Sequence, residues 1–155
     1  MNGRPPLADA LSAEIAGFEA LNCVLEEERD ALVGADADRL LSLSEDKARA
    51  VERLVELAQA RTAALQAMSL DPSTGDFQKR IAACDHRLAP LWTSLVAVAS
   101  QARERNRING DLLSSRMAHN RAALDTFHAA ARRHSVYGPD GQSVFQSANR
   151  PLGQA

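Results

Sequence analysis

The stretch RERNRINGDLLSSRMAHN, residues 103–120, lies in the middle of the longest helical pattern in this 155-residue chain. Its apolar residues recur every three or four positions, which is the period of one face of an α-helix. The same cadence extends back to Leu88 and forward to Ala131. We therefore expect one long C-terminal helix over residues 90–134, with an apolar seam along one side.

Two further apolar stripes precede this helix, over residues 7–33 and 36–67. The short stretch VGADADR separates them, and a connection this short is typical of an antiparallel helical hairpin. We expect Gly34 to take the left-handed position that closes the first helix, and Asp36 to cap the second. After the loop SLDPSTGD, a short helix is expected over residues 76–89.

Pro90 falls between the last two predicted helices. Proline lacks a backbone N–H and clashes with the preceding helical turn. Because the apolar cadence crosses Pro90, we expect a kink or a tight restart, with Pro90 in the first turn of the new helix.

These patterns predict an all-α fold, namely an elongated antiparallel helical hairpin or coiled-coil bundle of three to four helices with one long C-terminal helix. No strand pattern was found in the sequence. A chain of 155 residues is expected to form one domain, here over residues 1–137. Residues 138–155 lack the apolar pattern and are predicted to form a flexible tail.

Composition and charge narrow the function classes. Apolar residues make up 45% of the chain and aromatic residues only 4%, which favours helices packed through aliphatic seams. Residues 1–68 are net acidic and residues 69–155 are net basic, so the simplest interpretation is an acidic layer packed against a basic one. The formal net charge is −2, and no aromatic residues interleave with the arginines. Nucleic-acid binding is therefore not expected.

Cysteine usage and hydropathy predict the compartment. Cys23 and Cys84 belong to no paired motif, so we expect buried or half-buried free thiols in a reducing compartment. Residues 1–11 lack the apolar core of a signal peptide, and no segment approaches eighteen uninterrupted apolar residues. A cytoplasmic protein without direct membrane insertion is predicted.

Catalytic motifs were not found. The sequence has no Gly-rich phosphate loop, no zinc-ligand spacing and no Gly-x-Ser-x-Gly motif. His119 is a candidate for phosphotransfer, because a single histidine on a helical bundle performs that reaction in phosphotransfer domains. Those domains place a Lys and a small Gly-Ser pair after the histidine, whereas Asn120 and Arg121 follow here. We predict no enzyme activity, no cofactor and no metal, and keep phosphotransfer only as an outside alternative.

Asn106 and Asn109 fall on the apolar seam, and Gly110 follows them. A polar residue at a core position of a coiled coil costs stability but sets register or partner choice. Glycine allows two backbones to approach closely, although it costs about 1 kcal/mol relative to alanine inside a helix. We interpret the two asparagines as register marks, where the seam changes from an internal to an intermolecular contact.

The last predicted helix is longer than its partners, at 1.5 Å per residue, so part of its far end is expected to lack intramolecular cover. An open apolar seam is either a subunit interface or a groove for the amphipathic helix of a partner. Methionine, which adapts to imperfect shapes, suits the second interpretation. A structural coiled-coil protein that only self-associates remains the main alternative.

Three stretches together resemble the FlgN family of flagellar export chaperones. They are ERDALVGADADRLLSLSEDKARAVERL (residues 28–54), NRINGDLLSSRMAHNRAALDTF (residues 106–127) and VYGPDGQ (residues 136–142). The resemblance extends from about Leu11 to Gln142. It implies an elongated all-α chaperone of the type III pathway that binds the C-terminal segments of hook-filament junction proteins. Such a chaperone prevents premature assembly and delivers its substrate to the export gate.

In that family the C-terminal helix and the segment after it bind the substrate. The resemblance therefore implies the following substrate-binding residues: Asn109, Gly110, Leu113, Met117, Asn120, Leu124, Phe127 and Tyr137. We expect specificity to come from the asparagines and from a basic flank of Arg103, Arg105, Arg107, Arg116 and Arg121.

Overall fold

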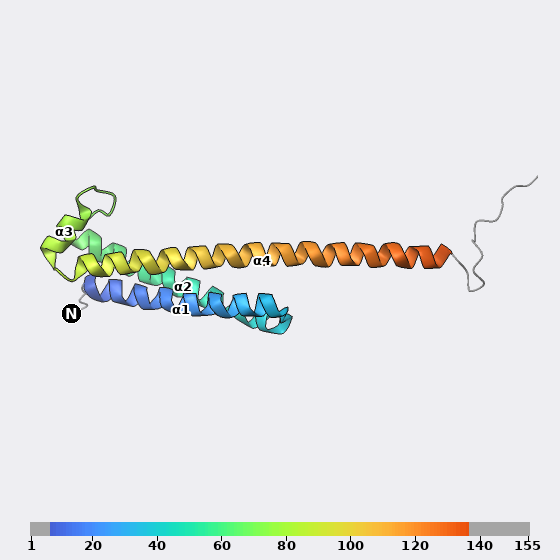
Figure 1. Ribbon diagram of the computed structural model, residues 1–155. Coiled ribbons are helices and arrows are strands. Elements are labelled where there is room, and N and C mark those ends of the chain that lie inside the picture. The colour runs from blue at the N-terminus through green and yellow to red at the C-terminus, as the bar shows by residue number, and fades with distance from the viewer. Residues whose placement is uncertain (1–6, 137–155) are drawn as a thin grey trace, which may run out of the picture. The chain divides into compact units, whose positions relative to one another are not determined.

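The computed structural model describes residues 7–136, which form four helices and no strand. The helices are α1 (Leu7–Gly34), α2 (Ala37–Ala67), α3 (Phe77–Cys84) and α4 (Leu88–Val136) (Figure 1). The predicted all-α fold with a long C-terminal helix is confirmed.

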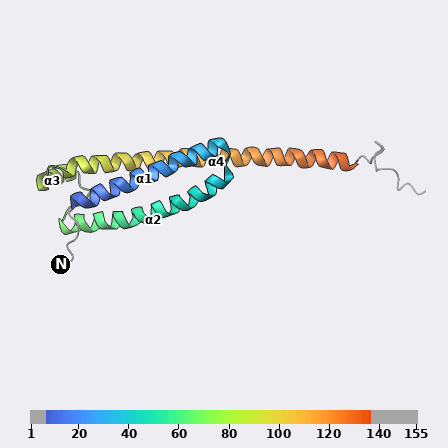
Figure 2. The same cartoon turned by 90° about the horizontal axis from the view of Figure 1, so that it is seen from below.

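The chain divides into two compact units, Met1–Leu112 and Leu113–Ala155. In the first unit, α1 and α2 form an antiparallel hairpin, and the first part of α4 runs along α1 (Figures 1 and 2). The second unit, as far as it is described, is the remainder of α4.

The turn between α1 and α2 differs from the prediction by one residue. Ala35, with φ of 57°, takes the left-handed position, whereas Gly34 is the last residue of α1. The N–H of Asp36 donates to the carbonyl of Ala31 at 3.0 Å, as expected for a Schellman motif centred on Ala35. The cap of α2 was predicted correctly, because the Asp36 carboxylate accepts a hydrogen bond from the Arg39 N–H at 2.9 Å.

Helix α2 also ends in a Schellman motif. Ser69, with φ of 54°, takes the left-handed position, and the N–H of Leu70 donates to the carbonyl of Leu65 at 3.0 Å. Leu70 is buried in the same hydrophobic cluster as Leu65, which is the apolar contact that commonly accompanies this motif. The chain is thereby turned toward α3.

Short helix α3 closes one end of the three longer helices. Phe77 and Ile81 lie one turn apart, and both are buried. The Phe77 ring meets the Trp92 ring edge to face, with centroids 4.7 Å apart. Helix α3 therefore completes the hydrophobic core at this end.

An Asx turn separates α3 from α4. The Asp85 carboxylate accepts hydrogen bonds from the Arg87 N–H at 2.9 Å and from the Arg87 guanidinium at 2.7 Å. These hydrogen bonds lower the pKa of Asp85 to about 2. Helix α4 begins at Leu88, so Pro90 lies in its first turn, where a missing N–H costs nothing. The tight restart is therefore the observed arrangement.

The core of the first unit consists of two hydrophobic clusters. The cluster near α3 includes Leu11, Leu65, Ile81 and Leu95, and the second cluster includes Leu25, Leu54 and Ala102. Along α4, the buried residues follow a seven-residue step: Leu88, Leu95, Ala102 and Asn109. This step is the coiled-coil period, and its fourth position is an asparagine.

Candidate functional site

A polar junction joins α1, α2 and α4 where the apolar core ends. The Glu28 carboxylate of α1 accepts a hydrogen bond from Asn109 Nδ2 of α4 at 2.8 Å. The same carboxylate pairs with Lys47 Nζ of α2, at 3.1 Å from each of its oxygens. Asn109 is 3% exposed, and the side chains of Glu28 and Lys47 are largely covered. One acidic residue thus holds a residue of each of the other two helices.

Side chains of α1 and α4 also bond directly to each other's backbone. Asn109 Nδ2 donates to the Leu25 carbonyl at 2.8 Å, and Asn22 Nδ2 donates to the Val98 carbonyl at 3.2 Å. Arg105 donates to the Asn22 carbonyl at 2.9 Å. Such bonds form only in one axial alignment, so they set the register of α4 on α1.

The two buried asparagines carry an energetic cost. The amide oxygens of Asn22 and Asn109 are buried without a hydrogen-bond partner among residues 7–136. A buried polar atom without a partner costs about 1–3 kcal/mol. An apolar residue at position 109 would avoid this cost, but it would leave the Leu25 carbonyl and the Glu28 carboxylate without the hydrogen bond that Asn109 donates.

Of the two asparagines that were interpreted as register marks, only Asn109 is buried between helices. Asn106 is exposed, and its side chain makes no hydrogen bond with any described residue. Gly110 is exposed as well, and an added Cβ would meet no atom within 4 Å. The close helix approach occurs instead at Gly17, where a Cβ would lie 2.8 Å from Leu57 Cδ1. The sequence pattern did not single out Gly17.

The second unit carries a row of exposed apolar side chains. Leu113 is 47% exposed, Met117 64%, Leu124 58% and Phe127 68%. Asn120 lies in the same row and is also exposed. At about 100° per residue, all five fall within an arc of about 80°, so they share one face of the helix. We call these five residues the apolar face of α4. Tyr137 lies outside the described residues.

Part of the expected basic flank is occupied within the fold. Arg105 bonds to α1, and Arg107 pairs with Glu104 and Asp111 on its own helix, each at 2.7 Å. Hydrogen bonding to Arg107 lowers the pKa of Glu104, and the same bond raises the pKa of Arg107. Arg103 makes no ion pair with any residue in the described part of the chain.

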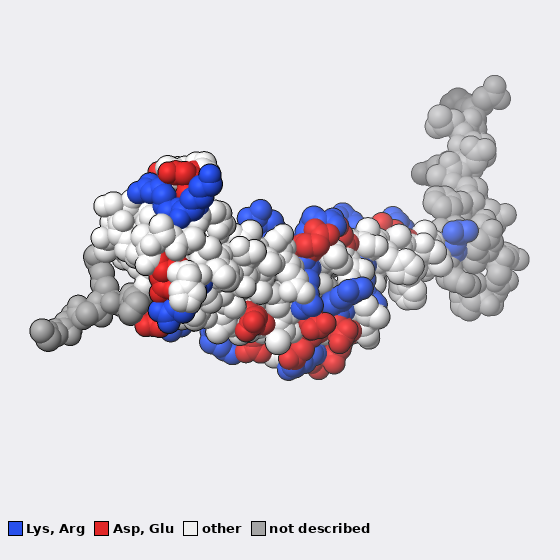
Figure 3. Space-filling view, turned by 60° about the vertical axis from the view of Figure 1, so that its left-hand side comes forward, with Lys and Arg blue, Asp and Glu red and all other residues white. Residues whose placement is uncertain are grey.

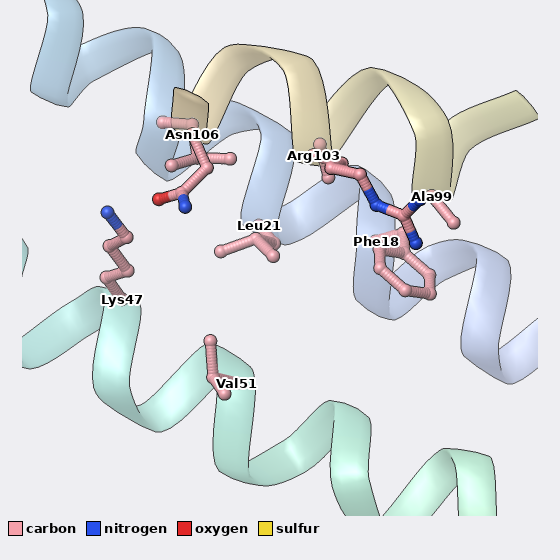
Figure 4. A pocket seen from close by; sticks show the side chains of 9 residues that line it. Phe18, Leu21, Lys47, Val51, Ala99, Arg103 and Asn106 are labelled. Carbon is pink, nitrogen blue, oxygen red and sulfur yellow. The ribbon is translucent and has the colours of Figure 1, made fainter. Parts of the chain in front are cut away.

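A pocket of about 320 Å³ opens between α1, α2 and α4 in the first unit (Figure 4). Phe18 and Leu21 of α1, Val51 of α2 and Ala99 of α4 give it an apolar lining, while Lys47 and Asn106 point toward one another across it. We call this cavity the interhelical pocket, and its lining consists of Phe18, Leu21, Leu25, Lys47, Val51, Ala99, Ala102, Arg103 and Asn106. The sequence pattern did not predict it, because its walls come from three separate helices.

Charged side chains of both signs (Figure 3) and two free thiols lie on the surface of the protein. Acidic and basic side chains are interspersed on the face shown in Figure 3. Ion pairs such as Arg61–Glu14 and Arg39–Glu27 join α2 to α1, and all four residues belong to the acidic half of the sequence. An ion pair between the basic and the acidic half, as the sequence led us to expect, is formed by Arg105 of α4 and Glu26 of α1. Cys23 and Cys84 are free but exposed, so their predicted burial was wrong.

Within residues 7–136, no helix has the length and apolar character that a membrane span requires.

Comparison with known proteins identifies the family. No curated protein and no solved structure matches the chain. The family model described as FlgN protein matches residues 1–144. FlgN is a family of chaperones and not of enzymes, and its model spans most of the sequence. The chain therefore belongs to the FlgN family and is a flagellar export chaperone.

Proposed function

We propose that this chaperone acts in the cytoplasm and binds the C-terminal amphipathic segment of hook-filament junction proteins on the apolar face of α4. The observation that supports this proposal is the exposure of Leu113, Met117, Leu124 and Phe127 along one side of the helix. Large exposed apolar rows on soluble proteins commonly mark sites of protein interaction. An amphipathic segment of the substrate would cover this row.

The binding energy would come from apolar burial. Complete burial of a fully exposed leucine or phenylalanine side chain contributes about 1.5–3 kcal/mol, so covering Leu113, Leu124 and Phe127, which are 47%, 58% and 68% exposed, contributes about half to two thirds of that for each. Met117 adapts its shape to different substrate side chains. Asn120, the one polar member of the face, favours an alignment that gives its amide a hydrogen-bond partner.

The remaining predicted site residues have different parts in this proposal. Asn109 acts as a positioning residue, because its side chain is already bonded to Leu25 and Glu28. Gly110 and Tyr137 are included because of the family resemblance. While bound, the substrate segment is kept from assembling early, and the complex travels to the type III export gate.

The test is calorimetric titration of the chaperone with a C-terminal fragment of a junction protein. Leu113→Asp and Met117→Asp are expected to weaken binding by at least tenfold, because each places a charge in the contact. Ser115→Asp is the matched control, since Ser115 is exposed on the opposite side of the same helix. Helix content by circular dichroism should be equal in all variants. Equal affinities for Met117→Asp and Ser115→Asp would refute the assignment of the face.

Self-association is the competing function, because the same exposed apolar row could pair with a second copy. Sedimentation equilibrium separates the two. A monomer that forms a 1:1 complex with the junction fragment supports the chaperone proposal. A tight homodimer that Met117→Asp converts to monomer, and that does not bind the fragment, would support the self-associating alternative.

A further inference from the structure

We propose that the interhelical pocket is a docking site for an acidic amphipathic helix of a partner protein, separate from the apolar face of α4. The pocket lies entirely within the first unit, and Phe18 and Leu21 of α1 form its floor (Figure 4). Leu25 of α1 also lines it. Helices α2 and α4 form its two sides. Its occupant would therefore lie between α2 and α4, over α1.

The apolar surface continues beyond the pocket in one direction. Val55 lies one turn from Val51 on α2, and Val96 lies about one turn from Ala99 on α4. Because α2 and α4 run antiparallel, both valines extend the pocket toward the end that α3 closes. Val51, Val55 and Val96 are all exposed. In a four-helix bundle, a fourth helix covers such positions, and no helix among residues 7–112 covers them here.

The positive charges of the pocket lining favour an acidic partner helix. The lining includes Lys47 and Arg103 but, among the described residues that form it, no carboxylate. Arg103 has no ion-pair partner within residues 7–136, whereas Lys47 is held by Glu28 at 3.1 Å. Asn106 offers an amide without a hydrogen bond to any described residue. A carboxylate of the partner helix would therefore give Arg103 an ion-pair partner that the described residues do not supply.

The dimensions suit a short helix. From Val96 to Asn106 the wall formed by α4 extends about 15 Å at 1.5 Å per residue, which matches about three turns of a partner helix. The volume of about 320 Å³ is at the lower end of the usual range for ligand pockets. It would accept a few aliphatic side chains projecting from one helix face, spaced three and four residues apart.

The test uses two fluorescein-labelled helical peptides of about 14 residues, with leucines at i, i+3, i+4 and i+7. One peptide carries glutamates beside the leucine stripe, and the other carries lysines at the same positions. Fluorescence anisotropy measures their binding to the full chain and to Arg103→Glu, Val51→Ser and Met117→Asp. Arg133→Glu is the matched control for Arg103→Glu, because it reverses the same charge at an exposed site of the same helix.

We expect the acidic peptide to bind at least tenfold more tightly than the basic one, and Arg103→Glu to remove or reverse this preference. Val51→Ser should weaken the acidic peptide by about tenfold, while Arg133→Glu and Met117→Asp should leave its affinity unchanged. Absence of saturable binding would overturn the proposal. Loss of binding in Met117→Asp but not in Arg103→Glu would also overturn it, because the peptide would then lie on the apolar face of α4. A homodimer that dissociates in Val51→Ser would replace the partner helix with a second copy.

Discussion

Asn106 and Asn109 lie three residues apart on α4, and their surroundings are opposite. Asn109 is buried and bonded to Leu25 and Glu28, whereas Asn106 is exposed at the rim of the interhelical pocket. A step of three residues corresponds to about 300° around a helix, so two residues of one sequence stripe can lie on different sides of a packing boundary. The pattern identified the stripe but not this boundary.

These environments predict different mutational costs. Asn109→Ala removes the hydrogen bonds to the Leu25 carbonyl and the Glu28 carboxylate, so it should lower the free energy of unfolding by about 1–3 kcal/mol. Asn106→Ala should change it by less than about 0.5 kcal/mol, because the side chain is exposed and unbonded in the described part of the chain. Urea denaturation measures both. Equal losses for the two variants would contradict the register role of Asn109.

The conformation of the turn between α1 and α2 predicts that swapping the adjacent residues Gly34 and Ala35 would stabilise the fold. Ala35 occupies a left-handed conformation that is strained for a residue with a Cβ, while the adjacent Gly34 is helical and has open space around it. The double variant Gly34→Ala, Ala35→Gly should therefore raise the free energy of unfolding by about 1 kcal/mol or more. Thermal and urea denaturation of the double and single variants check this. A lower stability for Ala35→Gly alone would contradict the assignment of the left-handed position.

At the scale of the element, the predicted ends of the helices agree with the observed ends where the sequence has a clear capping residue or a proline. Asp36 caps α2 as predicted, and Pro90 lies in the first turn of α4. Helix α3 ends at Cys84, before the predicted residue 89, because Asp85 forms an Asx turn with Arg87. The local hydrogen bonds of an Asx turn compete with those of the helix, and the spacing of apolar residues does not reveal them.

Two glycines inside helices predict opposite responses to the same substitution. Gly110→Ala should raise the free energy of unfolding by about 0.5–1 kcal/mol, because alanine is the better helix former and no atom is close. Gly17→Ala should lose this gain or destabilise, because its Cβ would lie 2.8 Å from Leu57 and 3.0 Å from Leu54, both buried. Chemical denaturation of both variants gives the comparison. A larger gain at Gly17 than at Gly110 would contradict the close approach of α1 and α2.

At the scale of the whole molecule, the two units differ in what stabilises them. Both hydrophobic clusters consist of residues from the first unit, and the described large apolar side chains of the second unit are exposed. Most helical stability in proteins comes from the packing of an apolar face, and isolated helices are marginal in water. The second unit, in the free protein, lacks that contribution from the core clusters.

Hydrogen exchange on the full chain should therefore show a sharp fall in protection along α4. Amides of residues 91–109 are expected to exchange slowly, and amides of residues 113–133 much faster, because local opening there breaks no core contact. Binding of a junction fragment should raise protection in residues 113–133 and leave α1 unchanged. Uniform protection along α4 in the free protein would contradict this division.

The sequence by itself determined the all-α class, the hairpin, the long last helix and the membership in a chaperone family. Those properties depend on local periodicity, caps and motifs, each of which is written within a few neighbouring residues. Only the tertiary structure decided which seam asparagine is buried, which glycine lies at a close approach, and where α1, α2 and α4 enclose a pocket with Arg103 on its wall. These features depend on residues distant in the chain, such as Asn109 with Glu28 and Gly17 with Leu57, and no local pattern encodes such pairs.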